Sequence, residues 1–179
     1  MDMTRRLIQE RGFTLVEMVL ALVILGIISG VAYSNISGSI EKIRLNGASQ
    51  KLTSDIRYAR EMALSRHDTY GLEFDIAGNF YQVFVLNGVT KTVINDPQKN
   101  TSMIIDFDDR PEFKGVMISS VNSCVGVGCL TAEIRFTSFG IPQDANNGTF
   151  TSAATVGLQN GSQTKSIQVN QQTAFTEIV

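Results

Sequence analysis

A single carboxylate, Glu17, interrupts the most apolar stretch of the chain. Residues 13–32 carry no other charged side chain, and no later segment resembles this one. Twenty helical residues rise about 30 Å at ~1.5 Å each, which matches the hydrocarbon core of a bilayer. A carboxylate in such a helix costs roughly 2.5 to 3.5 kcal/mol at the membrane centre and less near an end, so it usually marks a partner. Glu17 is therefore the first candidate functional residue.

Basic side chains precede the apolar stretch, and none follows it until Lys42. Residues 1–12 contain three arginines against two acidic side chains. The positive-inside rule places this polar leader in the cytoplasm and everything after Ala32 outside. Most of the chain is therefore expected to be exported.

The two cysteines, Cys124 and Cys129, lie in the part of the chain expected to be exported and enclose four small or apolar residues. Thiols are oxidised outside the cytoplasm, so we interpret the pair as a small disulfide loop. Such a loop acts either as a local staple, which we favour, or as an interaction surface. The spacing differs from the Cys-x-x-Cys of a redox catalyst.

Side chains for catalysis or metal binding are scarce. The chain has one His, two Cys and no Trp, too few soft ligands for a structural zinc tetrad. An acidic cluster is formed by Asp106, Asp108, Asp109 and Glu112. This cluster lacks the Gly and the terminal Glu of an EF-hand loop, so we interpret it as a solvated turn without a metal. His67 falls at the expected end of a long helix, where it complements the helix dipole.

The sequence favours neither an enzyme nor a nucleic-acid-binding protein. No Gly-x-Ser-x-Gly motif or phosphate-binding loop occurs, so we expect no catalytic residue and no cofactor. Removing the leader takes away three basic and two acidic side chains and leaves 12 against 15. Repulsion from phosphate is then the default, and nucleic acid is an unexpected partner.

The amino-terminal segment allows two ordinary interpretations. A cleaved secretory signal finds a small-x-small site at Gly30-Val31-Ala32 and predicts a mature terminus near Tyr33. Twenty apolar residues, however, exceed the usual apolar core of such a signal, about 7 to 15 residues. A plain single-pass anchor accounts for the length. Neither interpretation explains Glu17.

A third interpretation does explain it. The apolar stretch opens with Gly12-Phe13-Thr14-Leu15-Val16-Glu17, directly after the basic leader. This run resembles the class III signal of type IV pilins and type II secretion pseudopilins. The resemblance implies that a prepilin peptidase cuts between Gly12 and Phe13 and methylates the new amino terminus, so that Glu17 becomes the fifth mature residue. Gly12 lacks a Cβ, which permits the close backbone approach that the cut needs.

The new ammonium group and Glu17 lie about one helical turn apart, roughly 6 Å along the axis. Neither charge is stable in hydrocarbon unless it is paired. In a filament, the Glu17 of an axially displaced neighbour can meet the amine of this chain in a low-dielectric core. We therefore expect Glu17 to act in assembly.

A helix is expected to continue beyond the apolar stretch to about residue 66, because no proline occurs before Pro97. Spacings of mainly three and four predict one packed apolar face, formed by Ile36, Ile40, Ile43, Ala48, Leu52, Ile56, Ala59 and Ala63. A solvated face is predicted for Glu41, Lys42, Arg44, Lys51, Asp55, Arg57, Arg60 and Glu61.

From Tyr70 the apolar period changes from near 3.6 to two, which predicts strands. Asn87-Gly88 between two such runs indicates a hairpin. Strands are expected at residues 70–76, 80–86, 89–94, 103–107, 116–121, 132–137, 155–159 and 166–170. The fold class is therefore α+β, with a mainly antiparallel, strand-rich head packed on the outer half of the long helix.

The head carries a second resemblance, in small elements that follow one another in order. They are Ile134-Arg135-Phe136-Thr137, Phe139-Gly140-Ile141-Pro142, Val156-Gly157-Leu158, Asn160-Gly161 and Ile167-Gln168-Val169. This order is similar to the ending of the GspH/FimT family of minor pseudopilins and minor pilins. The resemblance implies a low-abundance subunit that helps to initiate or cap a type II secretion pseudopilus or a type IV pilus.

These observations divide the chain into four segments: a cleaved leader (1–12), a transmembrane or filament-core helix half (13–33), an amphipathic helix half (34–68) and a β-rich head (69–179). The expected partners are other pilin or pseudopilin subunits, prepilin peptidase, an inner-membrane assembly platform and, before assembly, membrane lipid. The expected location is the bacterial inner membrane, with a single pass and the head in the periplasm or exterior, and later a filament or its tip.

Three alternatives to a minor subunit stay open. A major filament-forming pilin shares every feature of the amino-terminal half. A minor pilin for DNA uptake and a secreted module released by ordinary signal peptidase are further possibilities. The native amino terminus separates the last of these from the others, because it predicts Tyr33 in place of a methylated Phe13.

Overall fold

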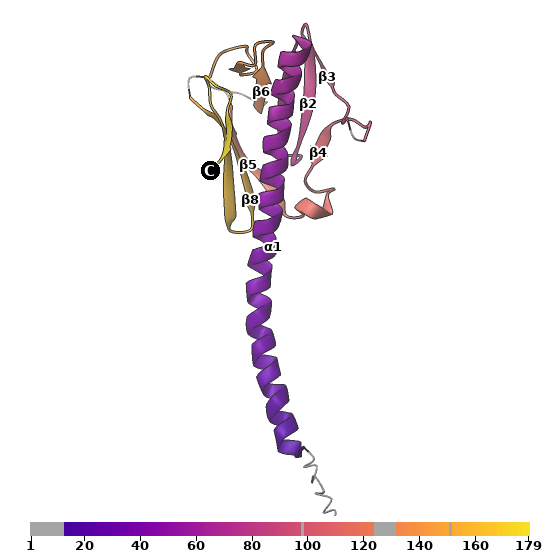
Figure 1. Cartoon of the computed structure of the whole chain (residues 1–179), viewed down its shortest axis with the longest axis vertical. Helices are drawn as coiled ribbons and strands as arrows, with labels where there is room; N and C mark the ends of the chain where they lie inside the picture. The colour runs from indigo at the N-terminus through magenta and orange to yellow at the C-terminus, as the bar shows by residue number, and fades with distance from the viewer. Residues whose placement is uncertain (1–12, 98, 124–131, 151) are drawn as a thin grey trace, which may run out of the picture. The chain divides into compact units, whose positions relative to one another are not determined.

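The computed structural model describes residues 13–97, 99–123, 132–150 and 152–179, with only the backbone at 31–37. In these residues one long helix, α1 (Leu15–Arg66), precedes ten strands and a short 3-10 helix, η1 (Pro111–Phe113). The chain forms two compact units, residues 1–39 and residues 40–179 (Figure 1). The first part of α1 belongs to one unit and the remainder of the helix to the other.

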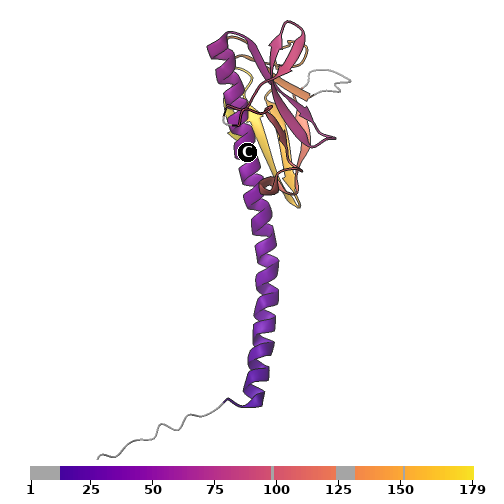
Figure 2. The same ribbon diagram turned by 90° about the vertical axis from the view of Figure 1, so that its right-hand side faces the viewer.

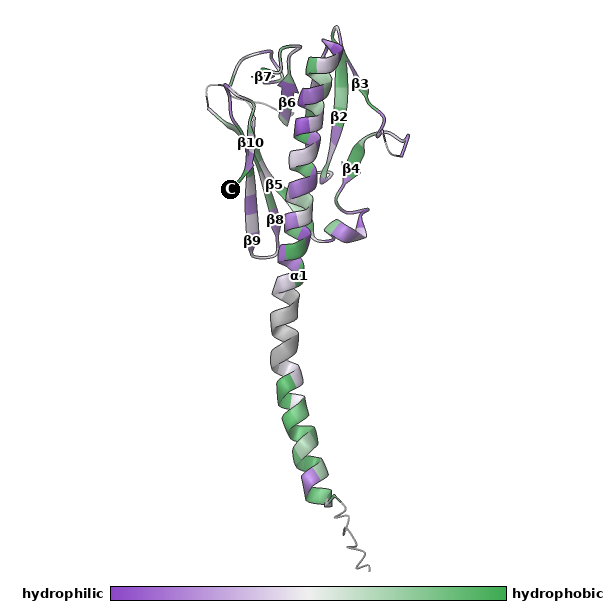
Figure 3. Cartoon of the chain, viewed as in Figure 1, coloured by the Kyte–Doolittle hydropathy of each residue, from purple (hydrophilic) through white to green (hydrophobic). Residues whose placement is uncertain are grey.

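The first unit contains the apolar start of α1. Large apolar side chains are exposed on successive positions around the helix, from 79 % at Leu15 to 59 % at Ile28. Figure 3 shows hydrophobic colouring along these turns. Among the residues searched, which are those the structure describes, no helix has the length and apolarity that a membrane crossing requires. The transmembrane assignment of residues 13–33 stays a prediction.

In the second unit, the rest of α1 packs along both sheets, which lie on the same side of the helix in Figure 2. Its buried face consists of Leu45, Ala48, Leu52, Ile56, Ala59 and Ala63, each at most 1 % exposed. The predicted face is thus confirmed from Ala48 onward. It is wrong at Ile40 and Ile43, which are 41 % and 68 % exposed. Leu45, about 200° around the helix from Ile43, has the buried position instead.

One sheet has the strand order β3-β2-β1-β6-β7, and β4 also pairs with β2. All of its pairings are antiparallel. The central strand, β1, has its register with β6 fixed by Leu72 opposite Ile134. The strands are β1 (Thr69–Asp75), β2 (Phe80–Asn87), β3 (Thr90–Val93), β4 (Ile104–Asp106), β6 (Ala132–Phe136) and β7 (Pro142–Gln143).

The second sheet has the antiparallel order β10-β9-β8-β5. Its strands are β5 (Val116–Asn122), β8 (Ala154–Asn160), β9 (Gln163–Val169) and β10 (Thr176–Ile178). The inner faces of the two sheets and the buried face of α1 enclose one apolar core. Within it, the rings of Phe74, Tyr81, Phe107 and Phe113 follow one another with centroids 5.7–5.9 Å apart.

The α+β class is confirmed, and each of the eight expected strands is present in whole or in part. Two further strands, β7 and β10, were not predicted, because two and three residues are too few to show an alternating pattern. Ile76 was placed in the first strand, but β1 ends at Asp75 and Ile76 is 47 % exposed.

One side chain of the predicted solvated face is buried. Asp55 is 3 % exposed, and its carboxylate accepts hydrogen bonds from Lys51 at 2.6 Å and from the Tyr81 hydroxyl at 2.7 Å. The solvated assignment of Asp55 was therefore wrong. A charge at this position is stable because a cation and a hydroxyl replace the water that burial removes.

Candidate assembly site

The first turn of α1 is capped by Thr14. Its side-chain oxygen Oγ1 accepts the backbone N–H of Glu17 at 3.3 Å, and its carbonyl accepts the N–H of Met18 at 3.2 Å. This is the Thr-x-x-Glu arrangement of a helix start, in which the third helical residue is acidic. Glu17 thus lies at a position that the positive end of the helix dipole favours. Our sequence interpretation missed the cap, although the spacing of Thr14 and Glu17 signals it.

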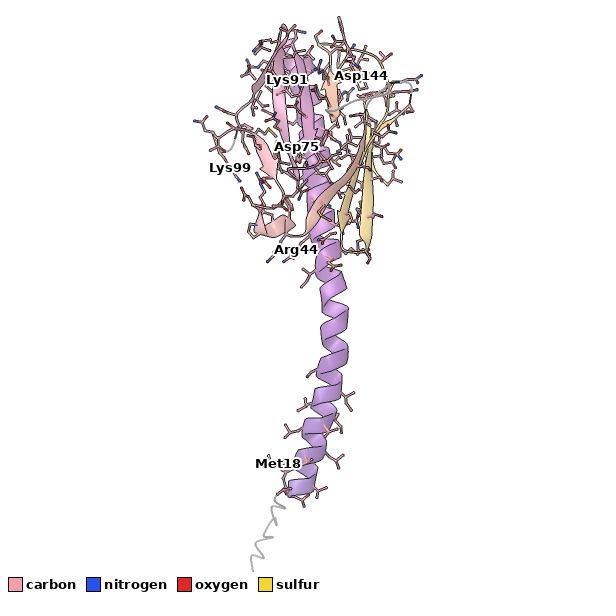
Figure 4. All side chains as sticks on the ribbon, turned by 180° about the vertical axis from the view of Figure 1, so that it is seen from behind. Met18, Arg44, Asp75, Lys91, Lys99 and Asp144 are labelled. Carbon is pink, nitrogen blue, oxygen red and sulfur yellow. The ribbon has the colours of Figure 1, made fainter. Side chains whose placement is uncertain are left out.

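Glu17 is surrounded by exposed apolar side chains. Phe13 is 79 % exposed, Val16 66 % and Met18 64 %. Figure 4 shows side chains of these first turns, Met18 among them, pointing away from the helix. Among the described residues, no side chain pairs with the Glu17 carboxylate. A helix that is apolar on every face is built for burial against something other than water.

The other predicted site residues have different outcomes. Phe13 lies just before α1 and is exposed, and Glu17 is in its first turn. Gly12, Cys124 and Cys129 lie outside the residues that the structure describes. The cleavage position and the disulfide loop therefore stay predictions.

The acidic cluster forms a turn that is held by its own side chains. The Asp106 carboxylate accepts the backbone N–H groups of Asp108 and Asp109 at 2.8 and 3.4 Å. The Asp108 carboxylate accepts a side-chain N–H of the buried Asn79 at 2.9 Å. Asn79 also bonds Val116 and Ile118 of β5, so it ties the β1–β2 turn to the second sheet. No group of three or more metal-ligating side chains is found in the described part of the chain.

A second polar cluster lies on the first sheet. Lys91 bonds both Glu73, at 2.7 Å, and Glu133. Glu133 is 2 % exposed and also pairs with Arg135 at 2.7 Å. Lys91 and Arg135 both lie over the ring of Phe84, at 5.3 and 6.0 Å from its centroid.

These contacts shift two pKa values. Burial by itself raises the pKa of Glu73, but hydrogen bonds from Lys91 and Gln82 outweigh it and hold the pKa below the ordinary value. Burial lowers the pKa of Lys91, but its bonds to Glu133 and Glu73 outweigh it and raise the pKa. Both shifts favour the charged forms, so the cluster stabilises the sheet by ion pairing.

Comparison with known proteins identifies both halves of the chain. The model of the prokaryotic N-terminal methylation motif matches residues 8–33, and the model of the type II transport protein GspH matches residues 48–173. No curated protein sequence matches the chain.

Two solved structures share the fold. The minor pseudopilin EpsH from the type 2 secretion system of Vibrio cholerae has a TM-score of 0.54 at 10 % identity, over 76 % of this chain and 96 % of that one. The type IV minor pilin FimU of Pseudomonas aeruginosa has a TM-score of 0.52 at 15 % identity, over 78 % and 90 % of the two chains. At these identities the likeness shows the fold alone.

An amino-terminal methylation motif followed by such a head defines a pilin-like subunit, a class of membrane-anchored proteins that assemble with other pilin subunits. The GspH model covers more than half of the chain. The chain therefore belongs to the GspH family of type II transport proteins, and it is a minor pseudopilin or minor pilin.

Proposed function

We propose that this chain is a structural subunit that helps to initiate or cap a type II secretion pseudopilus or a type IV pilus. Prepilin peptidase cuts between Gly12 and Phe13 and methylates the new terminus. The observation that carries the proposal is the Glu17 carboxylate, which has no partner among the described residues and lies in a helix start with exposed apolar side chains. Such a carboxylate calls for a cation from another chain.

The amine released at Phe13 supplies that cation. It lies close to Glu17 of its own chain along the helix axis, and a neighbour displaced along the axis brings the two groups of different chains together. The pair forms where apolar side chains exclude water, so the attraction is strong and fixes the axial register of the subunits. The Thr14 cap supports this role, because it starts the helix directly after the predicted cut.

Before assembly, the subunit rests in the bacterial inner membrane with residues 13–33 in lipid and the head in the periplasm. The basic residues of the leader favour this orientation. Extraction into the filament then exchanges lipid for the apolar helices of neighbouring subunits, at an inner-membrane assembly platform. The role is structural and needs no catalytic residue or cofactor.

Glu17→Ala tests the proposal against Glu61→Ala, which removes an exposed glutamate of the same helix from the second unit. Each full-length variant is produced in the native host, and its share in sheared filaments or isolated tip complexes is measured by immunoblot. We expect Glu17→Ala to reduce incorporation by at least about tenfold, since removing one partner of a buried pair is strongly destabilising, and Glu61→Ala to leave it unchanged. Equal incorporation of Glu17→Ala and the unmodified chain would contradict the proposal.

A further inference from the structure

The strand β10 is the free edge of the second sheet. Its inner side pairs with β9, where Val179 and Ser166 exchange two backbone hydrogen bonds and Asn170 donates to Phe175. Bonded positions alternate in an antiparallel pair, so the backbone groups of Thr176 and Ile178 point away from β9. A free row of this kind is a template for another strand.

A groove of about 480 Å³ lies on that free side, between β10 and α1. From the helix it is lined by Gln50, Thr53, Ser54 and Arg57, and from the strand region by Phe175, Thr176, Glu177 and Ile178. Figure 3 labels β10 beside β9, with α1 alongside. The short side chains of Thr53 and Ser54 leave room on the helix side of the groove.

Two groups in the groove are set up for a backbone ligand. The Arg57 guanidinium donates to the Thr176 carbonyl at 3.0 Å, in the place of the N–H of an added strand. Thr176 is 2 % exposed, and its hydroxyl oxygen is buried without a hydrogen-bond partner among the described residues. An unpaired buried hydroxyl is destabilising unless a ligand completes its bonds.

We propose that this groove binds an extended segment of another pilin-like subunit, which adds to β10 as a further strand. Backbone groups of the segment pair with Thr176 and Ile178, and the segment releases Arg57 from the Thr176 carbonyl. An acidic side chain on the segment then pairs with Arg57, and an apolar one covers Phe175, which is 60 % exposed. This mode of recognition takes its affinity from the main chain and its specificity from alternate side chains. The inference rests on the proposed function, because it draws its partner from the same assembly.

Ser54→Trp fills the groove from the helix without altering β10. Ser54 is exposed, so the fold should tolerate the change, and an unchanged thermal midpoint by circular dichroism verifies this. The matched control is Thr164→Trp, which places the same ring at an exposed position on β9 outside the groove. The full chain is co-expressed in turn with each other chain of the same cell that carries the methylation motif, and co-purification in detergent is measured.

Hydrogen exchange of the β10 amides is measured in the free chain and in the complex. We expect the Thr176 and Ile178 amides to exchange at least tenfold more slowly in the complex, whereas the Glu177 amide, directed at β9, stays protected in both. We also expect Ser54→Trp to reduce co-purification at least tenfold and Thr164→Trp to leave it intact.

The groove is excluded as the binding surface if Ser54→Trp co-purifies like the unmodified chain, or if the Thr176 and Ile178 amides gain no protection. In either case the proposed function stands, because the complex still forms. Failure of the unmodified chain to associate with every such partner overturns the proposed function together with this inference.

Discussion

At the scale of single residues, the buried contact between Tyr81 and Asp55 is the most consequential for stability. Tyr81 is fully buried, and burial, with the neighbouring Asp55 charge, raises the pKa of its hydroxyl well above the ordinary value. The hydroxyl therefore stays protonated and donates to the carboxylate.

Tyr81→Phe leaves the buried Asp55 carboxylate with Lys51 as its only donor in the described residues. We expect the free energy of unfolding to fall by about 1.5 to 3 kcal/mol, the range for hydrogen bonds to charged groups. Urea denaturation of the head measures the change. Tyr58→Phe is the matched control, since no hydrogen bond of its hydroxyl is found in the described residues, and a similar loss in both variants would contradict the assignment.

The cluster around Lys91 predicts a pH dependence of stability. The pKa of Glu73 is lower in the folded state, so its contribution is present above the unfolded pKa, about 4, and is lost as the pH falls through the folded value. The pKa of Lys91 is raised, so its contribution is present below the unfolded pKa, about 10, and is lost as the pH rises through the folded value.

Lys91→Met should therefore lower stability near neutral pH, by about 1 to 2 kcal/mol, and weaken its fall on acidification below about pH 4. Arg135 still pairs with Glu133 in this variant, which limits the loss. Urea titrations between pH 3 and 7 measure both effects. An acid slope equal to that of the unmodified chain would exclude this role for the pair.

Local sequence identifies some of these residues and hides others. Glu17 is recognisable because it is the lone charge in an apolar stretch. Asp55 looks like one more charge on a helix surface, since its partner Tyr81 is 26 residues away on β2. Glu133 likewise reads as an ordinary strand glutamate, because Lys91 reaches it from β3 only after the sheet has formed.

At the scale of elements, α1 changes its exposed and buried sides along its length, and a pair of alanine substitutions tests the assignment. Leu52 is fully buried, so Leu52→Ala should lower the free energy of unfolding by about 2 to 5 kcal/mol. Ile43→Ala removes a side chain of similar size that is 68 % exposed and should change stability by less than about 0.5 kcal/mol. Thermal and urea unfolding of the two variants compare them, and equal losses would refute the assigned face.

The helix and the longer strands could be predicted because their apolar periods are visible in a dozen neighbouring residues. The division into two sheets could not. It depends on β6 pairing with β1 and on β5 pairing with β8, contacts between segments that are far apart in the sequence. The groove beside β10 was missed for the same reason, since a strand of three residues carries no periodic signal.

At the scale of the whole molecule, the apolar core of the second unit contains no residue before Leu45. We therefore expect a fragment of residues 34–179 to fold without the apolar start of α1. It should show the β-rich circular dichroism of the head, a cooperative thermal transition and a monomeric mass by sedimentation. A fragment that is unfolded at room temperature would show that the first unit is required for the core.

The central claim is that Glu17 lies in the apolar helix to meet an amine created by cleavage. Mass spectrometry of the native amino-terminal peptide, purified from the host membrane and from assembled material, tests it most directly. We predict that the chain begins at Phe13 and carries one methyl group on its terminal nitrogen. A chain that begins near Tyr33, or that retains Met1, would contradict the account.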